Sequence, residues 1–105
     1  MNAFIPVKKF TYEISNTDDI DLSNTERWGD LIGGGMLSNV GTQDVIIDDT
    51  YTLSPGQTMT IGIQYPYIDR SIYRVKFPYD RSSGQNRLAI TLYRIFPNAA
   101  IKHSN

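Results

Sequence analysis

The stretch MLSNVGTQDVIIDDTYTLSPGQTMTIGIQY, residues 36–65, decides the fold, because turn residues separate its short apolar runs at intervals too short for helices. Residues 58–65 alternate apolar side chains with threonine, glycine and glutamine, a period of two that is typical of a strand with one buried face. A proline–glycine pair precedes this run; proline presets the φ of the second turn position and glycine accepts the positive φ of the third. Residues 53–57 are therefore predicted to form a turn that joins residues 51–53 and 58–65 in a hairpin.

The same alternation predicts strands on both sides of this region. Further strands are expected at residues 7–14, 36–40, 45–48, 71–77 and 87–96. Residues 87–96 are apolar on both faces, which indicates a central strand or one whose second face meets another subunit. About six or seven short strands without helical crossovers predict an all-β fold: an antiparallel β-sandwich of jelly-roll or immunoglobulin-like (Ig-like) type, or a small barrel.

At most one short helix is expected. Residues 23–26, Ser-Asn-Thr-Glu, fit a capping box that starts at Ser23, and Trp28, Leu31 and Ile32 have the spacing of one helical face. Gly33 is then predicted to end the helix.

Three consecutive glycines occupy residues 33–35. They lack the Lys-Ser/Thr pair of a P-loop and the spaced glycines of a dinucleotide fingerprint. They are therefore predicted to form a loop or bulge in which backbones approach closely.

Length and composition indicate one domain that spans residues 1–105. A chain of 105 residues supplies a single core, and 40% hydrophobic and 20% charged residues are ordinary for a globular protein. The absence of cysteine excludes disulfides, thiolate metal sites and a cysteine nucleophile. No apolar run approaches twenty residues and the first residues lack a signal-peptide pattern, so neither a membrane span nor secretion is expected. The order of the termini stays open.

The net charge of −1 hides an uneven distribution of charged residues. Residues 1–63 carry nine acidic and three basic side chains, whereas residues 64–105 carry two acidic and seven basic ones. Two interpretations stay open. The two parts can interleave in the sheets and neutralise each other across strands. Alternatively, opposite faces of the domain carry opposite sign and orient neighbouring copies or a partner.

Candidate catalytic or metal-binding groups are few. The single histidine, His103, lies in a polar segment where nothing would orient it, so a Ser-His-Asp site has no support. The acidic segment Asp18 to Asp21 resembles the start of a calcium loop, but Asn24 replaces the turn glycine and Asp30 stands where a bidentate glutamate is needed. The chain is therefore not expected to be an enzyme, and no catalytic, cofactor or metal residue is assigned. Calcium binding at the acidic segment stays open.

A segment rich in tyrosine and arginine is the strongest binding feature. Aromatic rings beside guanidinium groups suit sugar stacking, single-stranded nucleic acid or a protein interface, unless the rings pack in the core. The near-neutral net charge argues against nucleic acid as a partner. With the second face of the last strand, this segment gives the candidate interface residues Tyr67, Arg70, Tyr73, Arg74, Lys76, Tyr79, Tyr93 and Ile95.

Residues 39–42 (NVGT), 45–48 (VIID) and 51–58 (YTLSPGQT) resemble small β-sandwich proteins of tailed and icosahedral bacteriophage particles. In those proteins a strand, an Asn-x-Gly turn, an apolar strand and a Leu-x-Pro-Gly-Gln/Glu hairpin follow one another. The resemblance implies a non-enzymatic virion structural protein, such as a capsid-associated, decoration, head-fibre or tail component. It implies location in the virion, or in the host cytoplasm before assembly.

The sequence therefore leads to a hypothesis of symmetric self-assembly. The partners would be the protein itself and other virion proteins, with the charge distribution setting orientation and residues 87–96 or the termini adding apolar contact. The alternative is a carbohydrate- or receptor-binding β-sandwich module that uses the tyrosine-rich residues 65–79 and takes a glycan as ligand. Neither hypothesis needs a cofactor.

Overall fold

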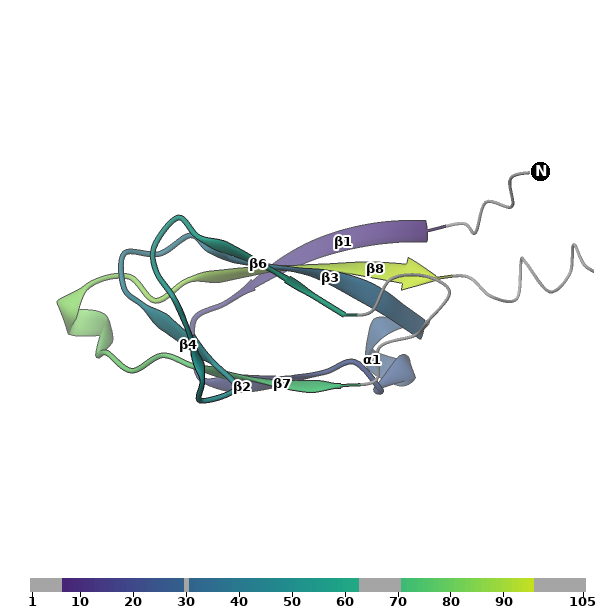
Figure 1. Cartoon of the computed structure of the whole chain (residues 1–105), viewed down its shortest axis with the longest axis horizontal. Coiled ribbons are helices and arrows are strands. Elements are labelled where there is room, and N and C mark those ends of the chain that lie inside the picture. The colour runs from purple at the N-terminus through teal and green to yellow at the C-terminus, as the bar shows by residue number, and fades with distance from the viewer. Residues whose placement is uncertain (1–6, 30, 63–70, 96–105) are drawn as a thin grey trace, which may run out of the picture.

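In the computed structural model, two antiparallel four-stranded sheets pack face to face (Figure 1). The structure describes residues 7–29, 31–62 and 71–95. In chain order the elements are β1 (Val7–Ile14), β2 (Asp18–Asp21), α1 (Thr25–Trp28), β3 (Leu31–Asn39), β4 (Val45–Ile47), β5 (Tyr51–Leu53), β6 (Thr58–Ile61), β7 (Ile72–Lys76), the 3₁₀ turn η1 (Arg81–Ser83) and β8 (Leu88–Ile95). The all-β prediction is confirmed, and the described ranges hold eight strands in place of six or seven.

The strand order identifies this sandwich as a jelly roll. Sheet I has the order β1-β8-β3-β6, and sheet II has the order β2-β7-β4-β5. The pairs are nested, because β1 pairs with β8, β2 with β7, β3 with β6 and β4 with β5. This is one long two-stranded strip, rolled up so that β8 also meets β3 and β7 also meets β4. Of the architectures predicted, the jelly roll describes this chain.

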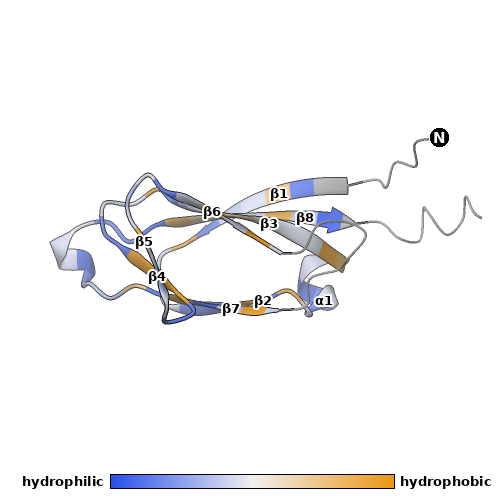
Figure 2. Ribbon diagram, in the orientation of Figure 1, coloured by the Kyte–Doolittle hydropathy of each residue, from blue (hydrophilic) through white to orange (hydrophobic). Residues whose placement is uncertain are grey.

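The core lies between the sheets and is built from the inward side of each alternating strand. On β8, Leu88, Ile90 and Leu92 are fully buried, while Ala89 and Thr91 between them stay partly exposed. Figure 2 shows hydrophobic residues on the strands of both sheets. Each buried leucine or isoleucine contributes about 1.5 to 3 kcal/mol. The other buried apolar residues are Ile20, Leu22, Trp28, Ile32, Leu37, Val45, Ile47, Leu53, Ile61 and Val75.

The proline–glycine turn forms where it is predicted, but it does not make a hairpin. The amide of Gln57 donates to the carbonyl of Ser54 at 3.0 Å, and Gly56 has the positive φ, 85°, that the turn requires. However, β5 pairs with β4 in sheet II, and β6 pairs with β3 in sheet I. The hairpin prediction is wrong because this turn carries the chain from one sheet to the other.

The connection at residues 48–50 is the hairpin that closes the rolled strip. Asp48 and Asp49 both have positive φ, 54° and 55°, as a two-residue turn that matches the strand twist requires. The amide of Thr50 donates to the carbonyl of Ile47 at 3.1 Å.

The short helix α1 is shorter than predicted. It ends at Gly29, which has a φ of 80°, and not at Gly33. Leu31 and Ile32 therefore begin β3 and do not extend a helical face. Within the described ranges, no helix is long and apolar enough to span a membrane.

The helix cap also differs from the predicted capping box. The side chain of Asn24 is the N-cap, because its Oδ1 accepts from the amide of Arg27 at 3.2 Å. The hydroxyl of Ser23 instead donates to the carboxylate of Asp21. A neighbouring acceptor two residues back thus removes Ser23 from the cap.

The three glycines form a bulge inside β3. The register of β3 with β8 shifts between Ile32 and Gly34. The strand β3 runs through this bulge and begins at Leu31, not at residue 36 as predicted. A Cβ atom on Gly34 would lie 2.9 Å from the carbonyl oxygen of Ile61. The close backbone approach predicted for residues 33–35 is confirmed.

Candidate interaction surfaces

The candidate interface residues do not gather on one surface. Tyr67, Arg70 and the side chain of Ile95 lie outside the described part of the chain. The other five are Tyr93 on the outer face of sheet I, Arg74 and Lys76 on the outer face of sheet II, Tyr79 in the β7–β8 connection, and Tyr73, which faces the core.

Tyr73 is engaged within the fold. It lies on the same side of β7 as the buried Val75 and packs against the core cluster. Its hydroxyl oxygen accepts from the amide of Gly62 at 3.2 Å. Of the two tyrosines described between residues 65 and 79, only Tyr79, at 53% exposure, presents a ring to solvent.

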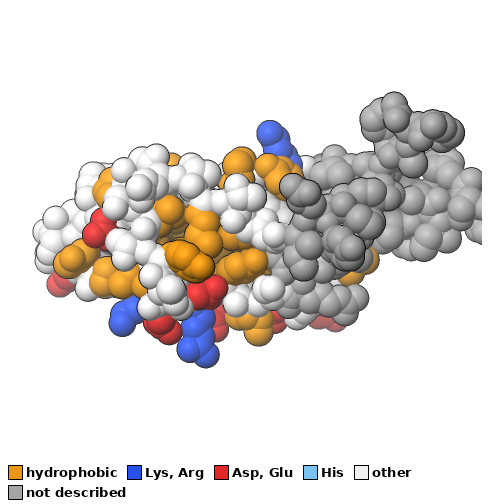
Figure 3. Space-filling view, in the orientation of Figure 1, with side chains coloured by type: hydrophobic (Ala, Val, Ile, Leu, Met, Phe, Trp, Pro, Cys, Tyr) orange, Lys and Arg blue, Asp and Glu red, His pale blue; other side chains and the backbone are white. Residues whose placement is uncertain are grey.

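Charges on the outer face of sheet II alternate in sign across the strands. Arg74 of β7 lies opposite Asp19 of β2, and its amide donates to Oδ1 of Asp48 at 2.9 Å on the other side. Figure 3 shows basic and acidic side chains next to each other along one edge of the molecule. At this face, the acidic and basic parts of the sequence interleave, which is the first of the two interpretations of the charge distribution.

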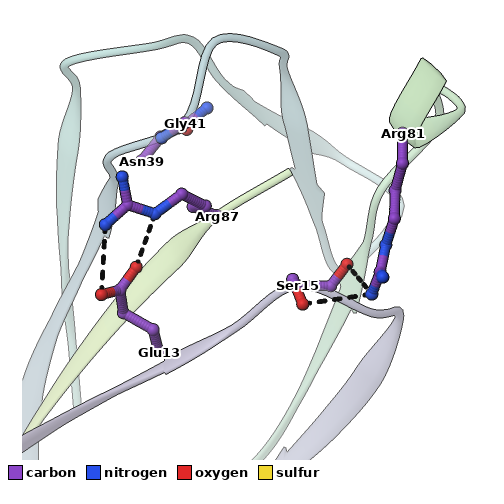
Figure 4. A network of polar contacts seen from close by, with 6 residues as sticks. All are labelled: Glu13, Ser15, Asn39, Gly41, Arg81 and Arg87. Atoms are coloured by element: carbon purple, nitrogen blue, oxygen red, sulfur yellow. Dashed lines mark hydrogen bonds and ion pairs between the residues drawn. The ribbon is translucent and has the colours of Figure 1, made fainter. Parts of the chain in front are cut away.

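Two arginines hold the end of the sandwich that carries η1 (Figure 4). Nε and Nη2 of Arg87 donate to the two carboxylate oxygens of Glu13 at 2.9 and 3.3 Å, and this hydrogen bonding raises the pKa of Arg87. Nη2 of Arg81 donates to the carbonyl oxygen and the hydroxyl of Ser15 at 3.4 and 3.1 Å. Both guanidinium groups therefore tie β1 and the loop after it to the segment before β8.

Three buried amide side chains hold the loops at the same end. Asn39, Gln43 and Asn86 are 1%, 9% and 7% exposed. Nδ2 of Asn39 donates to the carbonyls of Gln43 and Leu53, both at 2.8 Å. Nε2 of Gln43 donates to Oδ1 of Asn86 at 2.9 Å, and Nδ2 of Asn86 donates to the carbonyl of Tyr79 at 2.8 Å. Sequence analysis did not single out these amides, because a lone Asn-x-Gly turn does not indicate whether its amide is buried.

An open depression of about 260 Å³ lies beside this network. Its lining residues are Ser15, Arg81, Gly84, Gln85, Asn86 and Arg87. The two arginines in the lining already bind Ser15 and Glu13 of their own chain. A ligand that needs a guanidinium group here would have to compete with these contacts.

An aromatic cluster closes the other end of the sandwich, where α1 lies (Figure 1). The Trp28 ring centroid is 5.9 Å from that of Phe10 and 5.6 Å from that of Tyr12. The guanidinium of Arg27 lies 4.6 Å from the Trp28 ring, and that of Arg94 lies 4.9 Å from the Phe10 ring. Burial in this cluster raises the pKa of Tyr12 to about 12. Both guanidinium groups therefore pack on aromatic rings of their own chain.

The four strands at the sheet edges differ in how open they are to pairing. β6 and β2 have four residues and β5 has three, whereas the edge strand β1 has eight. β2 also carries three aspartates among its four residues. Short edges and charged edges resist pairing with another chain. β1 is therefore the long edge that the described strands leave open.

The acidic segment does not form a calcium loop. Asp18–Asp21 is the strand β2, and the carboxylate of Asp21 accepts from the amide of Ser23 at 2.9 Å. In the residues that the structure describes, no group of three side chains is placed to hold a metal ion. His103 and Asp30 lie outside those residues.

In comparisons with protein-family models, with curated proteins and with solved structures, nothing matched this chain.

Proposed function

We propose that this chain is a structural protein of a bacteriophage virion, which acts through symmetric self-assembly and protein–protein contacts and not through catalysis. The observation that carries the proposal is the nested strand order of a jelly roll, an architecture that viral capsid domains use. The resemblance of residues 39–42, 45–48 and 51–58 to phage particle proteins points the same way. Within the virion the chain would be a capsid-associated, decoration, head-fibre or tail component, and before assembly it would be found in the host cytoplasm.

Because one fold hosts many functions, the surface chemistry has to support the proposal as well. The described side chains best suited to ligand chemistry, Arg74, Arg81 and Arg87, each lie against acidic or loop groups of their own chain. The depression near η1 is open, and an open site does not exclude water from a reaction. The features left for function are sheet faces and the edge of β1, which suit contacts with other proteins.

Two measurements test the proposal. Antibodies raised against the chain should detect it in gradient-purified phage particles, and light scattering on the purified protein should give a mass above that of one chain. Absence of the chain from particles would overturn the virion assignment. A monomer at every concentration would overturn self-assembly.

A carbohydrate- or receptor-binding module is the second candidate. Lectin domains share the jelly-roll architecture, and Asn86, which lines the open depression, donates to the carbonyl of the exposed Tyr79. A glycan array should then give a signal that Tyr79→Ala removes. No signal from the unaltered protein, or a signal that Tyr79→Ala leaves intact, would reject this candidate.

A further inference from the structure

The sequence of β1 is self-complementary about its centre. Lys9, Thr11 and Glu13 are exposed and alternate with Phe10 and Tyr12, which pack against the core. If two copies of β1 pair antiparallel with Thr11 opposite Thr11, each Lys9 lies opposite Glu13 of the second copy. On the inner side, each Phe10 then lies opposite Tyr12 of the second copy. Opposite charges and aromatic pairs are both favourable cross-strand neighbours.

Alternative registers are less favourable. The exposed residues of one copy must face exposed residues of the other, which permits shifts of two residues only. Centring the pairing on Phe10 or Tyr12 sets a charged residue against Thr11. Centring it on Lys9 sets lysine against lysine, and centring it on Glu13 sets glutamate against glutamate. The register centred on Thr11 gives both charges an opposite partner.

We propose that two copies of this chain associate through their β1 edges, which joins the two copies of sheet I into one continuous antiparallel sheet. The contact is isologous, because the same seven residues of β1, 8–14, serve on both copies. The backbone groups of the β1 edge that the described strands leave without partners are then paired. This inference rests on the proposed function in that it specifies one self-contact of an assembling protein.

The neighbouring strand permits this contact. Glu13 binds Arg87 through both carboxylate oxygens, but the Glu13 and Arg87 side chains remain 47% exposed. A carboxylate accepts several hydrogen bonds, so Glu13 can face Lys9 of the second copy while it keeps Arg87. The Oγ1 atoms of Thr11 and Thr91 lie 2.8 Å apart, which holds the central residue of the edge against β8.

Charge reversal tests the register. Sedimentation equilibrium between about 1 and 300 µM should show a dimer of the unaltered chain, since edge pairing buries less area than a standard interface and is weak. Lys9→Glu sets two carboxylates against each other at both ends of the contact, as Glu13→Lys does with two ammonium groups. Each change should weaken the dimer at least about tenfold.

The decisive arm mixes the two variants. A Lys9→Glu chain and a Glu13→Lys chain are complementary, so the mixture should form a heterodimer of about the original affinity although neither variant dimerises with itself. Lys76→Glu on β7 is the matched control, because the same charge reversal lies in the other sheet. Arg87→Gln controls for loss of the internal ion pair in Glu13→Lys. Both controls should leave the dimer intact, and the fluorescence of the single tryptophan, Trp28, reports whether each variant is folded.

The outcomes separate this inference from the proposed function. A dimer that survives Lys9→Glu, or a mixture that stays monomeric, would overturn the β1 contact and leave other modes of assembly in the virion untouched. A chain that is monomeric over the whole range would also overturn the β1 contact, and its presence in purified particles would then decide the virion assignment. If the charge-reversal variants behave as expected but the chain is absent from purified particles, the β1 contact is supported and the virion assignment is rejected.

Discussion

The carbonyl oxygen of Thr91 lies well inside contact distance of the place where a Cβ atom on Gly35 would stand. Gly35 is opposite Leu92 in the β3–β8 register, so this close approach falls at the centre of sheet I. Backbone atoms cannot rotate away as a long side chain can. The pairing of the two central strands therefore depends on the missing side chain at this position.

Gly35→Ala should destabilise the protein by about 3 kcal/mol or more, because β3 and β8 must move apart to admit a methyl group. Urea unfolding followed by Trp28 fluorescence measures the loss. Gly56→Ala is the control: the added Cβ would meet nothing within 4 Å, but the φ of +85° is strained for alanine. That control should cost about 1 kcal/mol. Equal losses in the two variants would show that sheet I relaxes around a side chain at residue 35.

Asn39→Ala should cost about 2 to 4 kcal/mol, because it leaves the carbonyls of Gln43 and Leu53 buried without the donor they have now. It also removes one of the two acceptors of the Gly41 amide, which keeps only the carbonyl of Arg87, so the hydrogen exchange of this amide should become faster. Gln57→Ala is the matched control, since it removes an amide that is exposed and binds only the nearby Ser54 amide. A loss as small as that of the control would mean that water replaces the Asn39 contacts.

Sequence patterns predicted most of the strands, but not the strand β2 or which strands pair. The alternation in residues 71–77 puts Tyr73 and Val75 on one side of a strand, and both face the core. Sequence patterns also predicted strands at residues 51–53 and 58–65, but the turn between them joins two different sheets. A period of two shows which side chains share a face and carries no information about the partner strand. The buried amide of Asn39 depends on contacts with segments distant in the sequence. A single sequence does not show such contacts.

Arg74→Glu should destabilise the protein at low salt, because it would set three acidic groups in a row across β2, β7 and the β4–β5 turn. Asp19 and Asp48 are the neighbours on the two sides. We expect a loss of about 0.5 to 1.5 kcal/mol, and about half of it for Arg74→Gln, which removes the attraction without adding repulsion. Screening should bring the two variants together at high salt in urea titrations. Equal losses at low salt would contradict the charge alternation on this face.

Ionisation of Tyr12 should lower the free energy of unfolding as the pH rises from 10 to 12. Burial against Trp28 raises its pKa from 10.0 to about 12, with Asp18 adding to the shift and Arg27 opposing it. Between these values the unfolded chain loses the Tyr12 proton while the folded chain keeps it, so ionisation favours unfolding. The contribution is fully present below pH 10 and is lost as the pH passes through 12. Its size is about 1 to 2 kcal/mol after allowance for solvent screening.

The comparison with Tyr12→Phe isolates this effect. Contributions of all other groups are present in both proteins and cancel in the difference of unfolding free energies. That difference should be constant below pH 10 and should then move in favour of the variant up to about pH 12, the value to which burial raises the pKa of Tyr12. Urea titrations at several pH values, followed by Trp28 fluorescence, give the two curves. Parallel curves across this range would mean that the Tyr12 hydroxyl reaches solvent in the folded protein and that the cluster around Trp28 is more open than its contacts indicate.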